Sequence, residues 1–199
     1  MWMGRLYISR KHNSYLMSQK SLKRTMNYLR QTEIRFGIVS LVVTDEHMTA
    51  KSWYDGSVDC HANCVIFDGD TGSIYRYEPH GISEAHYNPI EVQRLLGAWV
   101  DSLTGGVGWH VMSQRWIPKG RNHQLKEDWH NVPSEIRDAY TGKVHKTGLC
   151  EVWSLFFALI VVLNPDVHPT DIYIIIDQWP DHILAVRIRQ FLVAIQCLY

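Results

Sequence analysis

The chain has 199 residues, of which 46% are hydrophobic and 20% are charged. This balance is typical of a globular protein that buries a core without disulfides, and it excludes an intrinsically disordered chain. Twenty lysine and arginine residues balance twenty aspartate and glutamate residues. A formal net charge of zero argues against a strongly basic nucleic-acid-binding protein, so we expect no nucleic-acid partner.

Four cysteines in a chain of this length do not form a disulfide framework. Cys60 and Cys64 lack a second ligand pair at zinc-finger spacing, so we expect neither a bound metal nor another cofactor. The N-terminus lacks the apolar core of a signal peptide, and the longest apolar run, Leu155 to Leu163, is too short to cross a bilayer. We therefore expect a soluble cytoplasmic protein with reduced thiols and no membrane partner.

Three elements are expected in the first 80 residues. Apolar residues recur at helical spacing over residues 14–31, which predicts a basic surface helix. The β-branched segment Ile38–Thr44 predicts a buried strand. Residues 61–79 predict a β-hairpin, because two strand-like segments, HANCVIFD and SIYRYEP, flank the turn-forming sequence DGDTG.

The middle of the chain predicts one helix and a long irregular segment. Asn88 as the N-cap and Pro89 at the first helical position indicate a helix over residues 88–103. Residues 107–149 show no clear period, so we expect mostly loop there, with a short strand at Gly108–Ser113.

Two helices are expected near the C-terminal end. Residues 150–163 are apolar on almost every side, which predicts a buried helix, and a second helix is expected over Asp181–Gln196. No repeat or Pro/Gly-rich linker divides the chain. We therefore predict a catalytic domain over residues 51–199, preceded by an extension and first strand over residues 1–50 that can belong to the same domain.

His61 and Glu78 flank the predicted hairpin turn symmetrically. Their midpoint falls between Gly69 and Asp70, so we expect the two residues to lie directly opposite each other on one face. A carboxylate there can accept a hydrogen bond from one imidazole nitrogen, fix the tautomer and make the other nitrogen more basic. Asn63 is a second candidate for this orienting role, because it lies two residues from His61 on the same strand face.

Cys150 begins the most apolar helix of the chain. The helix dipole and the unpaired backbone N–H groups at a helix N-terminus stabilise a thiolate. With His61 as the base and Glu78 as the orienting carboxylate, Cys150 completes the arrangement used in covalent catalysis, in the chain order His–Glu–Cys.

Two segments resemble a known group of cysteine proteases. HANCVIFDGDTGSIYRYEPHG (61–81) resembles the His-to-acid hairpin of adenovirus-type maturation proteases and of SUMO and ubiquitin-like-protein proteases. GLCEVWSLFF (148–157) is similar to a Gly-x-Cys-x-x-Trp-Ser segment in predicted proteases of giant DNA viruses. The resemblance covers roughly residues 58–166. It implies an α+β cysteine-protease fold, with the Cys150 helix packed on a mainly antiparallel sheet.

The chain departs from these families at some positions. Ala62 stands where a Trp often follows the catalytic His, and Glu151 where a Gly often follows the Cys. The families also carry a Gln shortly before the Cys, which donates to the oxyanion, whereas residues 143–149 contain none. The giant-virus proteins carry a Gln further upstream, and the similar segment PKGRNHQ here ends at Gln124. The resemblance therefore implies Gln124 as an oxyanion donor, with Gln114 as a second candidate, beside the backbone N–H of the nucleophile.

The implied function is a cysteine peptidase or isopeptidase. By resemblance it cleaves after a small residue such as Gly, in a viral precursor protein or in a ubiquitin-like conjugate, and a viral enzyme of this kind acts in the host cytoplasm or in the virion. Three alternatives stay open. They are an acetyltransferase on a related fold, a catalytically weak or inactive module that binds a ubiquitin-like protein, and a structural protein in which His61 and Cys150 never meet.

Overall fold

The computed structural model describes residues 1–9, 14–16, 19–44, 60–80, 88–112, 123, 130–140 and 149–196. The strands in these ranges are β1 (Trp2–Ser9), β2 (Ser14–Leu16), β3 (Phe36–Thr44), β4 (Cys60–Asp68), β5 (Ser73–Tyr77) and β6 (His110–Val111). The helices in them are α1 (Gln19–Gln31), α3 (Pro89–Thr104), α5 (Ser134–Tyr140), α6 (Cys150–Leu163), α7 (Pro169–Asp177) and α8 (Asp181–Gln196).

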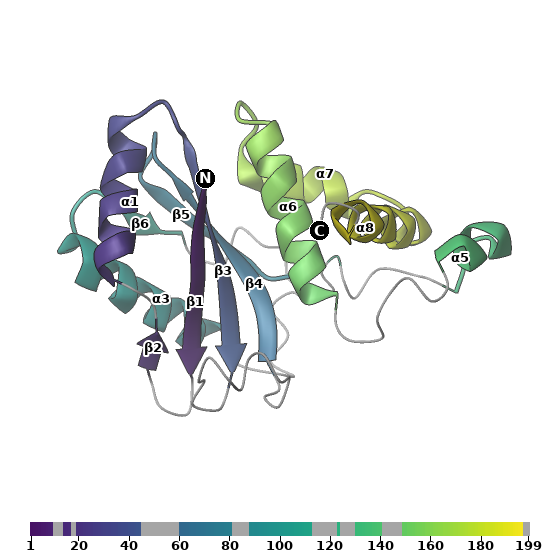
Figure 1. Ribbon diagram of the computed structural model, residues 1–199, viewed down its shortest axis with the longest axis horizontal. Helices are drawn as coiled ribbons and strands as arrows, with labels where there is room; N and C mark the ends of the chain where they lie inside the picture. Colours follow the sequence, from purple (N-terminus) through teal and green to yellow (C-terminus); the bar gives the residue numbers. More distant parts are fainter. Residues whose placement is uncertain are drawn as a thin grey trace.

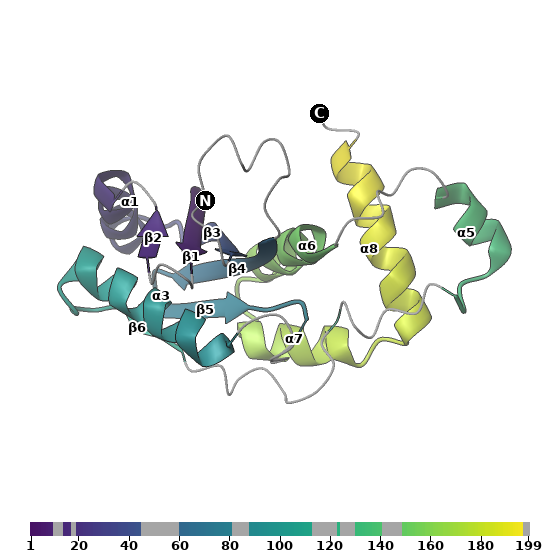
Figure 2. The same cartoon turned by 90° about the horizontal axis from the view of Figure 1, so that it is seen from below.

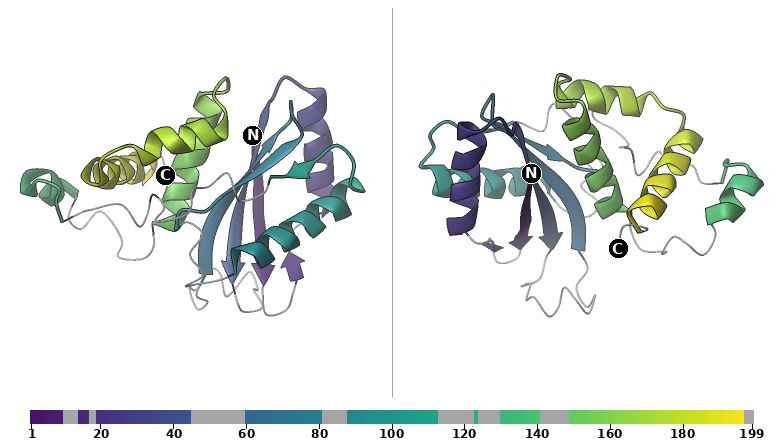
Figure 3. Two further views of the ribbon diagram at one scale, coloured as in Figure 1. Left: turned by 180° about the vertical axis from the view of Figure 1, so that it is seen from behind. Right: turned by 45° about the horizontal axis from the view of Figure 1, so that its top comes forward.

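All these strands belong to one sheet, in the order β2-β1-β3-β4-β5-β6. The pairs β1–β2, β3–β4 and β4–β5 are antiparallel, whereas β1–β3 and β5–β6 are parallel. The sheet is therefore mixed, and three of these five strand pairs are antiparallel. Helices α1 and α3 lie on one side of it and α6, α7 and α8 on the other (Figure 1). The described part of the chain thus has a mixed α+β architecture, and Figure 3 shows α3 running across the strands when seen from behind.

Side chains of β4 alternate between two apolar cores. Val65 and Phe67 belong to a core shared with α1 and α3, whereas Cys64 and Ile66 belong to a core shared with α6, α7 and α8. Because both faces are buried, the middle of the strand, Cys64–Phe67, is continuously apolar. His61 falls in the same alternating set as Val65, which places it on the face of α1 and α3.

The predicted strand, the hairpin and the three downstream helices are confirmed. Strand β3 contains Ile38–Thr44, and α6 and α8 span their predicted ranges. The N-cap of α3 is Asn88, whose side-chain oxygen accepts hydrogen bonds from two backbone N–H groups of the first turn. The short strand expected within Gly108–Ser113 is β6.

The helix predicted over residues 14–31 is wrong in its first turn. Helix α1 begins only at Gln19, and the segment before it contains β2, in which Tyr15 pairs with Ile8 of β1. The edge of β1 supplies backbone hydrogen-bond partners there, so pairing to the sheet replaces the first helical turn. Elements β1, α5 and α7 have no counterpart among the predictions. In the described ranges, no helix combines the length and apolar character needed to cross a membrane.

Candidate active site

The β4–β5 hairpin brings His61 and Glu78 together, although not as directly opposed residues. Cys64 pairs with Tyr77, and the same register continued past the end of β5 sets His61 opposite His80. The ring centroids of these two histidines lie 4.3 Å apart. Glu78 is therefore the diagonal neighbour of His61 on the same face, at a separation that a long side chain can span.

The prediction of direct opposition is wrong because of the turn. Asp68 and Ser73 close the ladder, so the centre of the hairpin lies one residue later than the midpoint of His61 and Glu78. The Gly72 N–H donates to the Asp68 carbonyl oxygen at 2.8 Å, and Gly72 has a φ of 69°. The Cβ of any side chain there would clash with the carbonyl oxygen of Gly108, two residues before β6. Gly72 therefore fixes the residue at which β5 begins.

Glu78 holds one ring nitrogen of His61. The distance between His61 Nε2 and Glu78 Oε1 is 2.5 Å, and the glutamate side chain is only 1% exposed. The same carboxylate oxygen accepts a hydrogen bond from the backbone N–H of His80 at 2.9 Å. These contacts fix the carboxylate and with it the ring of His61, which leaves His61 Nδ1 for a partner on its other side.

Cys150 reaches the same place from the N-terminus of α6 and is partly exposed. Its thiol lies near enough to His61 to raise the pKa of that imidazole, and the backbone N–H of Ala62 donates to Cys150 Sγ at 3.4 Å. One helical turn later, Ser154 Oγ donates to the Ala62 carbonyl oxygen at 3.4 Å. The N–H and C=O of a strand residue point to the same edge, so α6 binds the edge of β4 that faces away from β3. Figure 2 shows α6 beside this end of β4.

Charge at the site favours a protonated imidazole. Burial alone lowers the pKa of His61, but the hydrogen bonds to Cys150 and Glu78 and the charges of both groups outweigh burial and raise the pKa to about 9. At neutral pH the ring therefore carries a proton. An imidazolium between a carboxylate and a thiol is the arrangement that activates cysteine nucleophiles.

A buried arginine lies on the same face of β5. Arg76 is two residues before Glu78, and burial lowers the pKa of its guanidinium to about 10, although the charge of Glu78 acts in the opposite direction. Arg76 Nη1 donates to Asn63 Oδ1 at 3.1 Å. Asn63, the second candidate for orienting His61, therefore directs its oxygen to Arg76, and Glu78 is the side chain that the structure brings to the imidazole.

The two predicted oxyanion donors, Gln124 and Gln114, lie outside the described residues. His123, the neighbour of Gln124 in sequence, is fully buried. Its Nδ1 lies 2.9 Å from the Tyr77 hydroxyl oxygen, and its ring centroid lies 5.6 Å from that of Trp153 in the first turn of α6. His123 is thus packed behind the helix turn that carries the cysteine.

Sequence reasoning assigned no role to His80. In the part of the chain that the structure describes, His61, Glu78 and His80 each offer one ligand atom, and these atoms lie within 4.8 Å of one another. Two imidazoles and a carboxylate are a donor set that can hold a metal ion, whereas the sequence predicted none. The true hairpin register, which opposes the two histidines, is the signal that could have identified this group.

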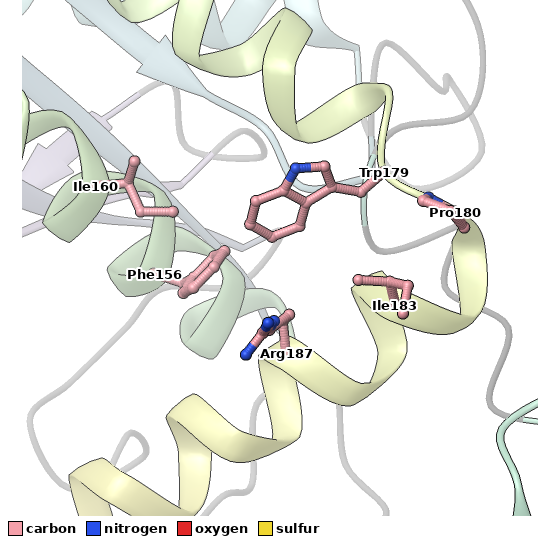
Figure 4. Close-up of a pocket in the computed structure, with 6 residues that line it drawn as sticks. All are labelled: Phe156, Ile160, Trp179, Pro180, Ile183 and Arg187. Atoms are coloured by element: carbon pink, nitrogen blue, oxygen red, sulfur yellow. The ribbon is translucent and has the colours of Figure 1, made fainter.

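A separate cavity of about 560 Å³ lies between α6 and α8 (Figure 4). Its lining is formed by Phe156, Ile160, Trp179, Pro180, Ile183 and Arg187. This lining is mostly apolar and contains no nucleophile or base. We therefore assign the cavity no chemical role.

No protein-family model matches the chain, and no curated protein matches it. The case for a function therefore rests on the residues of the site.

Proposed function

We propose that the protein is a cysteine peptidase or isopeptidase with a His61–Glu78–Cys150 triad. The observation that carries this proposal is that Glu78 holds one side of the His61 ring, while the Cys150 thiol, bound by the N–H of Ala62, lies near enough to raise the pKa of His61. The three residues come from the two ends of a hairpin and from the start of a helix 72 residues further on. A base, its orienting carboxylate and a nucleophile in mutual contact are what covalent catalysis requires.

The reaction follows from these three side chains. His61 accepts the proton of Cys150, or holds the thiolate as an ion pair, and the sulfur attacks the scissile carbonyl carbon. His61 then donates its proton to the departing amine as the C–N bond breaks, which leaves a thioester on Cys150. Water, deprotonated by His61, attacks the thioester, and the thiol returns as the carboxylic acid departs. Glu78 orients the imidazole throughout these steps.

The oxyanion formed during attack needs hydrogen-bond donors. We assign one to the backbone N–H of Cys150 at the start of α6 and one to Gln124. The burial of His123 against Trp153 supports this choice, because it anchors the residue before Gln124 near the first turn of α6. Gln124→Ala should lower kcat by about 10²–10³-fold. The matched variant Gln114→Ala should not, and the opposite result would move the role to Gln114.

The substrate class is proposed from the likeness of segments 61–81 and 148–157 to adenovirus-type and ubiquitin-like-protein proteases. The scissile bond would follow a small residue such as Gly, in a viral precursor protein or in a ubiquitin-like conjugate. For a viral enzyme, the site of action would be the host cytoplasm or the virion.

The test uses ubiquitin and SUMO probes that end in Gly-Gly and carry a C-terminal electrophile, together with Gly-Gly-containing peptides for a precursor-type substrate. We expect covalent labelling or peptide cleavage by the wild-type chain, and neither by Cys150→Ala. Ser154→Ala is the matched control, because it changes the same helix face one turn later and leaves the thiol.

The probe experiment, together with an assay that uses labelled acetyl-CoA, separates the alternatives. Tight binding of a ubiquitin-like protein without labelling would indicate an inactive binding module. Transfer of labelled acetyl from acetyl-CoA to Cys150, without peptide cleavage, would indicate an acetyltransferase. The absence of every one of these signals would leave a structural protein.

A further inference from the structure

The open end of the β4–β5 hairpin, away from its turn, holds more chemistry than the proposed triad uses. His80 lies three residues after the end of β5, and its ring is tilted by 33° to that of His61 at a centroid distance of 4.3 Å. Its backbone N–H donates to Glu78 Oε1 at 2.9 Å, which keeps the side chains of both histidines around one carboxylate. The ligand atoms of His61, Glu78 and His80 lie within 4.8 Å of one another.

This donor set selects a particular class of cation. Two imidazole nitrogens and one carboxylate oxygen suit Zn²⁺ and neighbouring divalent transition metals, whereas Mg²⁺ and Ca²⁺ prefer oxygen ligands. Three protein ligands with a fourth position open match the coordination number of catalytic zinc sites. Glu78 is 1% exposed, so His61 and the metal ion compete for a carboxylate that is largely shielded from water.

We propose that His61, Glu78 and His80 form a binding site for a divalent transition-metal ion such as Zn²⁺, and that this ion inhibits the proposed protease. The inhibitory part rests on the proposed function, whereas the binding part does not. Tetrahedral zinc with bonds of about 2.0–2.1 Å separates its ligand atoms by about 3.3 Å. The 2.5 Å contact between His61 Nε2 and Glu78 Oε1 must therefore open when the metal enters.

Metal binding and proton transfer exclude each other at His61. When Nε2 is bound to the metal, the neutral ring keeps its proton on Nδ1. Nδ1 is the nitrogen left to serve Cys150, so it can no longer accept the thiol proton. Glu78, held by the metal, can no longer orient the ring for catalysis.

Binding is measured first, by titrating ZnCl₂ into chelator-stripped protein in an isothermal calorimeter. A Cys150→Ser background removes the thiol as an alternative ligand and leaves the three proposed ligands intact. We expect one zinc ion per chain in this background, and no binding of Mg²⁺. Adding His80→Ala should weaken zinc binding by about tenfold or more, since even a partner of a ligand typically contributes that much.

Two further variants serve as controls for this measurement. His182→Ala removes an exposed histidine of α8 outside the cluster and should leave the zinc affinity unchanged. His80→Asn is a milder change that should reproduce the loss if His80→Ala misfolds. Equal zinc affinity in the Cys150→Ser background and in both His80 variants would contradict the proposed metal site.

Activity is measured second, with each protein compared to its own rate in chelator. Wild-type turnover should fall as zinc is added, and His80→Ala should need about tenfold more zinc for the same inhibition. If the chain cleaves substrate in chelator but its zinc binding does not depend on His80, this inference is refuted and the proposed function stands. If zinc binding depends on His80 but the chain cleaves no substrate in chelator, the metal site stands and the proposed function is refuted.

Discussion

The two ends of β4 each place a buried carboxylate against a basic side chain, but they do so with different chemistry. At the hairpin end, Asp68 is 1% exposed and accepts hydrogen bonds from Arg35 Nε and Nη2 at 3.1 and 3.0 Å. Arg35 also donates to the Pro165 carbonyl oxygen after α6. This ion pair ties the start of β3 to the hairpin and to the second helical layer.

At the other end, Glu78 is equally buried, but its partner is a histidine. An arginine keeps its proton at every physiological pH, whereas His61 has a pKa of about 9 and can exchange a proton with the thiol beside it. Under the proposed function, a buried acid–base pair supports catalysis only where the base titrates and a nucleophile is within reach. Arg35 and Asp68 have neither property and hold the fold together.

The largest expected effect is the loss of turnover in Cys150→Ala. Removal of the nucleophile should lower kcat by about 10⁴-fold or more, because no covalent intermediate can form. The variant should fold normally, which circular dichroism can check. Retention of more than a tenth of wild-type peptide cleavage would mean that the sulfur is not the nucleophile.

Glu78→Gln should have the next largest effect. The amide keeps the shape of the side chain but cannot stabilise the imidazolium, so we expect kcat to fall by about 10²–10⁴-fold. Thermal denaturation should show a much smaller loss of stability. Turnover close to wild type in this variant would remove Glu78 from the triad.

The pH profile of kcat/KM also tests the pairing of His61 with Glu78. Proton donation to the leaving amine needs protonated His61, and its raised pKa of about 9 means that activity should fall as the pH rises above about 9. Glu78 and Cys150 both raise this pKa, so Glu78→Gln should move the alkaline limb to lower pH. The measurement is made in chelator, because His80 and His61 can share a metal. An alkaline limb that stays at the same pH in Glu78→Gln would contradict the pairing.

The smallest expected effect concerns the hairpin end. Asp68→Asn should lower the free energy of unfolding by about 1–3 kcal/mol, since it removes charge-assisted hydrogen bonds to Arg35. The matched variant Asp70→Asn changes a carboxylate that is 65% exposed and 3.4 Å from Arg35 Nε, and should cost less than about 1 kcal/mol. Urea denaturation compares the two. A larger activity loss in Asp68→Asn than in Glu78→Gln would erase the distinction between the two ends.

Much of the candidate site can be predicted from the sequence because its signals are local. The apolar segment after Cys150 indicates a helix, and the DGDTG turn indicates a hairpin that returns Glu78 to the level of His61. The exact register cannot be predicted in this way. It depends on a four-residue turn with Gly72 at positive φ, which moves His80 opposite His61 and makes Glu78 a diagonal neighbour.

Elements stabilised mainly by tertiary packing are the ones that local patterns miss. The sequence of α7, PTDIYIIID, is rich in β-branched residues that favour strands, but Ile172, Tyr173 and Ile176 share one helical face that packs into the core of α6 and α8. Tyr15 fits a helical period, but it pairs with Ile8 at the edge of β1 and belongs to β2. The contact of Ala62 with Cys150 likewise joins residues 88 positions apart.

The rate of Cys150 alkylation by iodoacetamide as a function of pH tests the central claim without any knowledge of the substrate. Peptide mass spectrometry isolates Cys150 from the other thiols, and chelator keeps the site free of metal. The wild-type chain should be alkylated faster at pH 7 than His61→Gln, because a protonated His61 stabilises the attacking thiolate. Identical curves for both proteins, each following an ordinary thiol titration, would contradict a pairing of His61 with Cys150.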